Sequence, residues 1–251
     1  MPLDLSRART RIKPALDLPP LFHLVSLREV GDSFAHAKEI AAREGAGTLV
    51  YVGRFDLAEF AVVLEPEEPL VTARLAFYAG CAALADALAA HAPPEKAIEI
   101  EWPDAIRVDG GLVGGARLAW PAACAEDDVP DWLVFGAMIR TVAMGQDEPG
   151  VRPLSTALDE EGFGDTGSGR LVESFARHFL VAIDAWQDGG FGEVAKSYLG
   201  RLSREHGVRR DLAENGDLLV RRMGADHVER RELLPRLAVP SWFDPELRGP
   251  L

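Results

Sequence analysis

The chain has 251 residues, of which 47% are apolar and 27% are charged, as expected for a globular protein with a sizeable core. Its formal net charge of −13 argues against a nucleic-acid partner, because binding to phosphates requires a cationic surface. The two cysteines, Cys81 and Cys124, exclude a disulfide scaffold and a four-cysteine zinc site, and they favour a reducing compartment, with the cytoplasm as the expected location.

Residues 1–20 are predicted to form a flexible leader. This segment carries Arg7, Arg9, Arg11 and Lys13 without an apolar stretch after them, so no secretory signal is predicted. The most apolar run, Leu75 to Ala85, has about half of the roughly 20 residues that a membrane-spanning helix requires. We therefore expect no membrane partner.

Helices and short strands are predicted between residues 21 and 90. Asp32 or Ser33 caps a helix that runs to about Glu44. The strongest helical pattern of the chain extends over Val71–Ala90 and contains many small residues. Short apolar runs predict strands over His23–Leu27, Thr48–Val52 and Glu59–Leu64.

Strands and hairpins dominate the middle of the chain. Ile98, Ile100 and Trp102 alternate with glutamates, which predicts a half-buried strand. Asp109-Gly110 is a hairpin turn signal between two further strands. The remaining predicted elements are a strand over Trp132–Val142, a loop over 145–169, helices over Gly169–Trp186 and Phe191–Leu202, and a β hairpin at Asn215-Gly216-Asp217.

The order of these elements indicates the fold class. Because the strands cluster instead of alternating strictly with helices, we predict an α+β fold with a mixed or antiparallel sheet packed with helices. The predicted organisation is a leader over 1–20, a main domain over 21–202 and a small C-terminal β module over 203–251.

One segment resembles a known family signature. Residues 101–116 read Glu-Trp-Pro-Asp-Ala-Ile-Arg-Val-Asp-Gly-Gly-Leu-Val-Gly-Gly-Ala. They resemble the Lys-Trp-Pro-Asn-Asp, hairpin and Lys-x-x-Gly-Ile signature of the biotin–protein ligase and lipoate–protein ligase superfamily. Residues 132–140 look like the family's Val-x-Gly-x-Gly-Ile-Asn strand, and 156–162 like its Thr-Ser-Leu-x-x-x-Gly loop. The resemblance covers about residues 21–220 and implies a fold of the biotin ligase and class II aminoacyl-tRNA synthetase type.

The resemblance implies chemistry in two steps: a carboxylate attacks ATP to give an acyl-adenylate, and a lysine on a carrier domain then takes the acyl group. This sequence departs from the family at the charged positions. The lysine before Trp-Pro is Glu101, the active-site lysine position is Leu112, and the loop at 51–56 contains a single arginine. Since loss of one preorganised donor typically costs about 10²–10³ in rate, ordinary ATP-dependent ligation is not expected.

The resemblance also places candidate ligand-binding residues. Trp102, Asp104, Gly114 and Gly115 would border a pocket, and Arg140, Arg117 and Arg54 are candidate clamps for a carboxylate or phosphate. The alternatives are a core tryptophan, a β-bulge at the glycines and solvated strand arginines. The histidines show no ligand spacing, so no metal site is predicted.

Two functional hypotheses follow, and a third is less favoured. The first is a divergent ligase-family protein that binds a biotin-like, lipoate-like or fatty-acyl carboxylate, or its adenylate, in a pocket formed by Trp102, Asp104, Gly114, Gly115 and Arg140. The second is a non-catalytic protein that binds an acyl cofactor or a carrier domain. The third is an acyl transferase using Cys124, which its acidic neighbours Glu126, Asp127 and Asp128 disfavour because they raise the pKa of a thiol.

Overall fold

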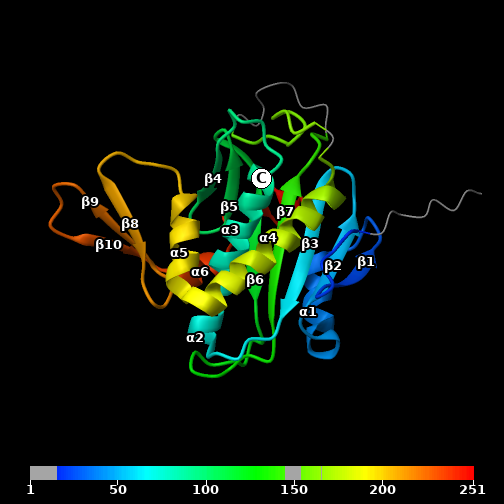
Figure 1. The fold of residues 1–251 in the computed structure, drawn as a ribbon, viewed down its shortest axis with the longest axis horizontal. Helices are drawn as coiled ribbons and strands as arrows, with labels where there is room; N and C mark the ends of the chain where they lie inside the picture. Colours follow the sequence, from blue (N-terminus) through cyan, green and yellow to red (C-terminus); the bar gives the residue numbers. More distant parts are fainter. Residues whose placement is uncertain (1–15, 145–153, 165) are drawn as a thin grey trace, which may run out of the picture.

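A seven-stranded sheet forms the centre of the protein (Figure 1). The computed structural model describes residues 16–144, 154–164 and 166–251, so most of the predicted leader and part of the predicted 145–169 loop lie outside the described residues. β1 and β2 are parallel, and the other neighbours are antiparallel. The strand order is β1 (His23–Leu27), β2 (Thr48–Gly53), β3 (Leu57–Leu64), β7 (Leu133–Arg140), β6 (Gly111–Ala119), β5 (Ala105–Val108) and β4 (Ile98–Glu101). The mixed sheet of an α+β fold is confirmed.

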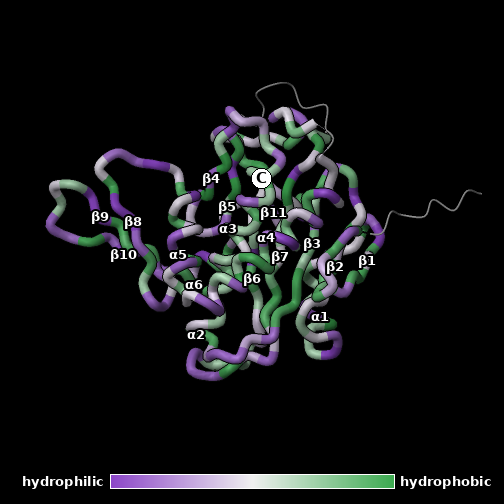
Figure 2. The backbone as a smooth tube through the Cα atoms, viewed as in Figure 1, coloured by the Kyte–Doolittle hydropathy of each residue, from purple (hydrophilic) through white to green (hydrophobic). Residues whose placement is uncertain are grey.

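One face of the sheet carries most of the helices and the main core. Aromatic rings from α3 (Ala76–Ala89) and α4 (Ser168–Gly189) pack against the strands, and the Phe135 ring centroid of β7 lies 5.6 Å from that of Phe175 and 6.1 Å from that of Phe179. Figure 2 shows hydrophobic residues concentrated along the central strands. The helices on this face are α2 (Leu70–Ala73), α3 (Ala76–Ala89), α4 (Ser168–Gly189) and α5 (Phe191–Gly200).

Helix α1 (Ser33–Glu44) packs on the opposite face. It begins as predicted, because the Asp32 carboxylate accepts a hydrogen bond from the Ala35 N–H at 2.8 Å. Its apolar residues cover β2, β3 and β7. On this side of the sheet, α1 leaves β5 and β6 to be covered by another part of the chain.

The predicted helix over Val71–Ala90 is broken in two at Arg74 and Leu75. The Arg74 side chain is buried at this turn, where it bonds to the Glu126 carboxylate and to the Asn215 carbonyl oxygen. Among the described residues, the segment over 70–89 is long and apolar enough to cross a membrane, but 83% of it is buried inside the protein. That burial is typical of a core helix.

The C-terminal part adds small sheets. β9 buries Leu218 and Val220 against the main core. The elements of the C-terminal part are β8 (Val208–Leu212), β9 (Leu218–Arg222), β10 (Val228–Arg231), α6 (Leu233–Ala238), β11 (Phe243–Asp244) and β12 (Gly249–Pro250). The boundary at residue 202 stays a prediction.

Candidate functional site

The chain from Ser241 to Leu251, here called the C-terminal segment, covers β5, β6 and β7 on the α1 side of the sheet. Its anchor is Trp242, which is fully buried and donates its indole N–H to the Ala116 carbonyl oxygen at 2.9 Å. A Cβ atom at Gly115 would lie 2.3 Å from the indole, so the ring needs glycine beneath it. The apolar walls are Leu57, Ala105, Leu112 and Met138.

Asp104, a predicted site residue, binds the first residue of this segment. Its carboxylate accepts hydrogen bonds from the Ser241 N–H at 2.9 Å and from the Ser241 hydroxyl at 2.6 Å. Burial raises the pKa of Asp104 to about 6, and the two bonds from Ser241 oppose that rise. Burial of the Asp104 carboxylate therefore costs free energy, and the two hydrogen bonds from Ser241 offset part of that cost.

Arg117, another predicted residue, joins α1 to the C-terminal segment. Its guanidinium lies 4.4 Å from the Phe34 ring centroid and 4.7 Å from that of Phe243. The Asp32 carboxylate is 3.7 Å from its Nη2 atom. Burial lowers the pKa of Arg117. The side chain is thus an enclosed cation between two rings, which differs from a solvated strand arginine.

A buried acid lies beside this arginine. The Glu59 carboxylate accepts a hydrogen bond from the Ser33 N–H at 2.8 Å, at the start of α1. Burial raises the pKa of Glu59, and that bond opposes the rise. The α1 side of the sheet therefore carries carboxylates as well as arginines.

Arg140 binds the other end of the C-terminal segment. Its Nη2 atom donates to the carbonyl oxygens of Pro250 at 2.9 Å and of Leu251 at 3.2 Å. The Ser155 hydroxyl donates to the same Leu251 oxygen at 2.6 Å. Arginine and hydroxyl donors that meet at one oxygen form a receptor for a carbonyl or carboxylate group.

Three predicted residues do not join this cluster. Trp102 donates its indole N–H to the Tyr78 hydroxyl at 3.2 Å and packs with the main core on the other face. Gly114, with φ of 151°, approaches the Met138 backbone so closely that a Cβ would lie 1.9 Å from its oxygen. Arg54 is paired with Asp56 at 2.6 Å. The structure therefore brings together Asp104, Gly115, Arg117 and Arg140.

The position of the family's active-site lysine is apolar here. Leu112 is buried in the cluster around Trp242. Lys96, the lysine nearest in sequence, is bound by Asp109 at 3.0 Å and by Glu161 at 2.7 Å. This ammonium is neutralised by two carboxylates at the β4–β5 end of the sheet.

The described residues do not fit a triphosphate. Asp32, Glu59 and Asp104 lie on the same side of the sheet as Arg117 and Arg140, and they would repel a polyanion. Both arginines already have partners. Among the described ranges, no group of three His, Cys, Asp or Glu side chains is placed to hold a metal ion.

Cys124 lies in the loop between β6 and β7. Partial burial raises the pKa of its thiol, and so do the nearby carboxylates Asp128 and Asp131. The same loop accepts backbone hydrogen bonds from the start of α2. A raised thiol pKa lowers the thiolate fraction, which disfavours a nucleophilic role.

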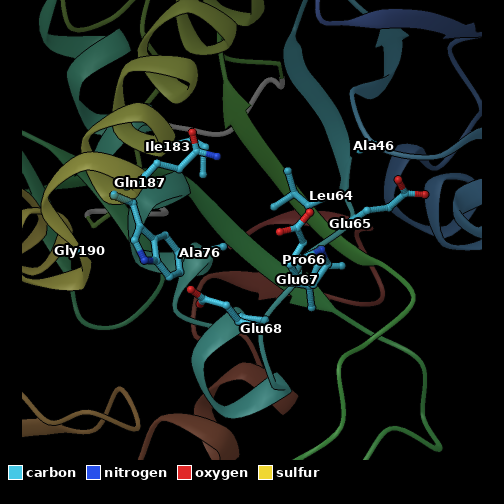
Figure 3. Close-up of a pocket in the computed structure, with 13 residues that line it drawn as sticks. Ala46, Leu64, Glu65, Pro66, Glu67, Glu68, Ala76, Ile183, Gln187 and Gly190 are labelled. Atoms are coloured by element: carbon cyan, nitrogen blue, oxygen red, sulfur yellow. The ribbon is translucent and has the colours of Figure 1, made fainter.

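A separate cavity of about 640 Å³ lies between α4 and the connection from β3 to α2 (Figure 3). Its floor is apolar, and Glu65, Glu67 and Glu68 are among the residues that line it. It contains none of the predicted site residues.

Sequence reasoning missed the C-terminal segment. Its contribution comes from Ser241, Trp242 and Phe243, which are more than 120 residues from their partners in the β4–β5 turn and in β6. The available signal was a pair of adjacent aromatic residues, Trp242 and Phe243, shortly after Pro240.

Comparisons with known proteins place this arrangement in context. The model of the biotin/lipoate A/B protein ligase family matches residues 18–200. A solved structure of a biotin protein ligase-like protein of unknown function from Silicibacter sp. TM1040 is 30% identical, with a TM-score of 0.72, and the match covers 86% of this chain and 96% of that chain. The comparison with curated proteins gives no match.

More distant solved structures share the fold alone. Biotin protein ligase from Aquifex aeolicus, in complex with biotin and ATP, is 16% identical with a TM-score of 0.61, covering 84% of this chain and 99% of that chain. The biotin protein ligase from Leishmania major in complex with biotin is 17% identical with a TM-score of 0.53, covering 86% and 99%.

Proposed function

Since the chain belongs to the biotin/lipoate A/B protein ligase family, we propose that it binds a biotin-like or fatty-acyl carboxylate on the α1 side of the sheet. The observation that carries this proposal is that Asp104 in the β4–β5 turn, Arg117 in β6 and Arg140 in β7 all contact the C-terminal segment on that face. The Aquifex aeolicus biotin protein ligase forms a complex with biotin and ATP, so biotin is the first ligand to test here.

Arg140 and Ser155 are the proposed receptors for the carboxylate of the ligand. Both already donate to the Leu251 oxygen, so their donor groups point to one place. A ligand carboxylate would form charge-assisted bonds with the guanidinium, which are stronger than its bond to the neutral Pro250 carbonyl oxygen.

The proposed activity is binding without ordinary ATP-dependent ligation. Adenylate formation requires cationic groups around the phosphates, and Leu112 supplies none at the lysine position. The acids on the same face oppose a nucleotide. An acyl-carrier or biotin-carrier domain is the proposed protein partner of such a binder.

Retained ligation is the competing function, because the family model matches residues 18–200 and Gly115 stands at a glycine of the signature that the sequence resembles. Pyrophosphate release separates the two. The protein is incubated with ATP and either biotin or lipoate, and calorimetry measures ligand binding in parallel. Binding without pyrophosphate release supports the proposal, release above background supports ligation, and the absence of both contradicts the proposed function.

Point variants locate the site in the same calorimetric assay. Arg140→Ala should weaken binding about tenfold or more, because it removes the guanidinium that is proposed to receive the ligand carboxylate. Arg54→Ala is the matched control, since Arg54 is paired with Asp56 outside the patch. Equal affinity of the two variants and the unmodified chain would place the ligand elsewhere.

A further inference from the structure

We propose that the C-terminal segment, Ser241–Leu251, is a displaceable occupant of the ligand patch, which opens without unfolding of the sheet and competes with the ligand. The competition rests on the proposed function, whereas the opening does not. The segment touches each of the converging predicted residues: Asp104, Gly115, Arg117 and Arg140.

The attachment of the segment is local. Trp242 belongs to a small apolar cluster of its own and is not a member of the main core around α3 and α4. β11 and β12 pair over two residues each, and the stretch between them, Pro245 to Arg248, is exposed. An element with few buried anchors and an exposed centre opens at a lower free energy than the core of its domain.

The groups beneath the segment are chemically unsuited to a purely structural role. A small cap over a sheet needs only apolar contacts, yet this one is held by a buried carboxylate, Asp104, and by two arginines. Buried charged groups are expensive, and replacement by apolar residues is often neutral or stabilising. Their presence under a tail therefore indicates a binding surface whose polar groups the tail satisfies.

The groups that the segment places in the patch indicate which features a competing ligand should have. Trp242 places a flat fused ring in the slot over Gly115 and donates an N–H to the Ala116 oxygen, while an oxygen is held by Arg140 and Ser155. A competing ligand should supply both features: a fused ring with an N–H donor, and a carboxylate. Biotin carries both, whereas the ring of lipoate has no N–H. The patch is therefore predicted to prefer biotin to lipoate.

Hydrogen exchange tests the opening without any ligand. In the full chain, the Trp242 indole N–H and the Leu251 amide, which bonds to the Trp242 oxygen at 2.8 Å, should exchange at least tenfold faster than the amides of β6 and β7. Equal protection of the segment and the sheet would show that the segment leaves only on global unfolding, and it would overturn the proposal.

Calorimetry with biotin and lipoate tests the competition. Trp242→Ala in the full chain should bind biotin at least tenfold more tightly than the unmodified chain, because apparent affinity scales with the fraction of open molecules. Leu247→Ala is the matched control, since that side chain is exposed, and its affinity should not change. Biotin should bind more tightly than lipoate to every variant.

The outcomes separate the two proposals. Equal biotin affinity in Trp242→Ala and the unmodified chain overturns the competition, and a preference for lipoate overturns the ligand assignment. If neither ligand binds to any variant, the proposed function fails, and the exchange measurement alone decides whether the segment opens. Fast local exchange then supports the opening, and uniform protection overturns it.

Discussion

The buried carboxyl group of Asp104 should make the stability of this protein depend on pH in a defined direction. Its pKa is raised from 3.8 to about 6 in the folded protein, so the folded state binds a proton more readily than the unfolded state. Stability therefore rises as the pH falls through this window. With about 1.36 kcal/mol per pKa unit, the whole window corresponds to about 3 kcal/mol, of which about 1.3 kcal/mol falls between pH 7 and pH 5.

Urea unfolding of the unmodified chain and of Asp104→Asn at pH 5, 6, 7 and 8 measures this contribution. The amide keeps the shape of the carboxyl group and does not titrate, so all other ionisations cancel in the difference. The free energy of unfolding of the unmodified chain, relative to the variant, should increase by about 1.3 kcal/mol from pH 7 to pH 5. A constant difference, or one that decreases as the pH falls, would refute the reasoning. Ser241→Ala should move the window to higher pH, because it removes the hydroxyl bond that lowers the pKa of Asp104 and keeps the backbone N–H bond.

Three substitutions test other contacts by urea or thermal unfolding. Arg117→Lys keeps the positive charge but loses the planar group between the Phe34 and Phe243 rings, so it should lower the free energy of unfolding by about 1 kcal/mol. An unchanged unfolding midpoint would show that the stacking contributes nothing. Leu112→Lys places an unpaired ammonium in the apolar cluster around Trp242, so it should lower the free energy of unfolding by about 3 kcal/mol or more. The variant should not release pyrophosphate from ATP; release would show that only the lysine was missing. Gly80→Ala should cost about 1–3 kcal/mol, because its Cβ would lie 2.2 Å from the Phe135 ring. Gly192→Ala, in helix α5 with open space around it, should instead stabilise the protein by up to about 1 kcal/mol; equal effects of the two substitutions would contradict the packing argument.

Local signals in the sequence predicted much of the fold. The cap at Asp32, the turn at Asp109-Gly110 and the alternation before Trp102 each depend on neighbouring residues, and each element formed where it was expected. The break at Arg74 was not predictable in this way. It follows from bonds to Glu126 and Asn215, which are distant in sequence and leave no periodic signal.

The candidate site was predictable only in part. The family resemblance indicated Asp104, Gly115, Arg117 and Arg140, which do meet on one patch. It did not indicate that a tail would cover them, because Ser241 and Asp104 are separated by 137 positions and share no motif. Their roles in binding, like the cytoplasmic location, stay predictions.

The turn at Arg74 also has a consequence for the integrity of a cleaved chain. The Arg74 guanidinium donates to the Asn215 carbonyl oxygen, and the Tyr78 hydroxyl donates to the Gly216 carbonyl oxygen at 2.5 Å. One turn of the α2–α3 region therefore binds the loop between β8 and β9. The link over residues 203–206, by contrast, is exposed. Trypsin cutting after Arg204 should therefore yield two fragments that stay bound to each other and elute together in size-exclusion chromatography.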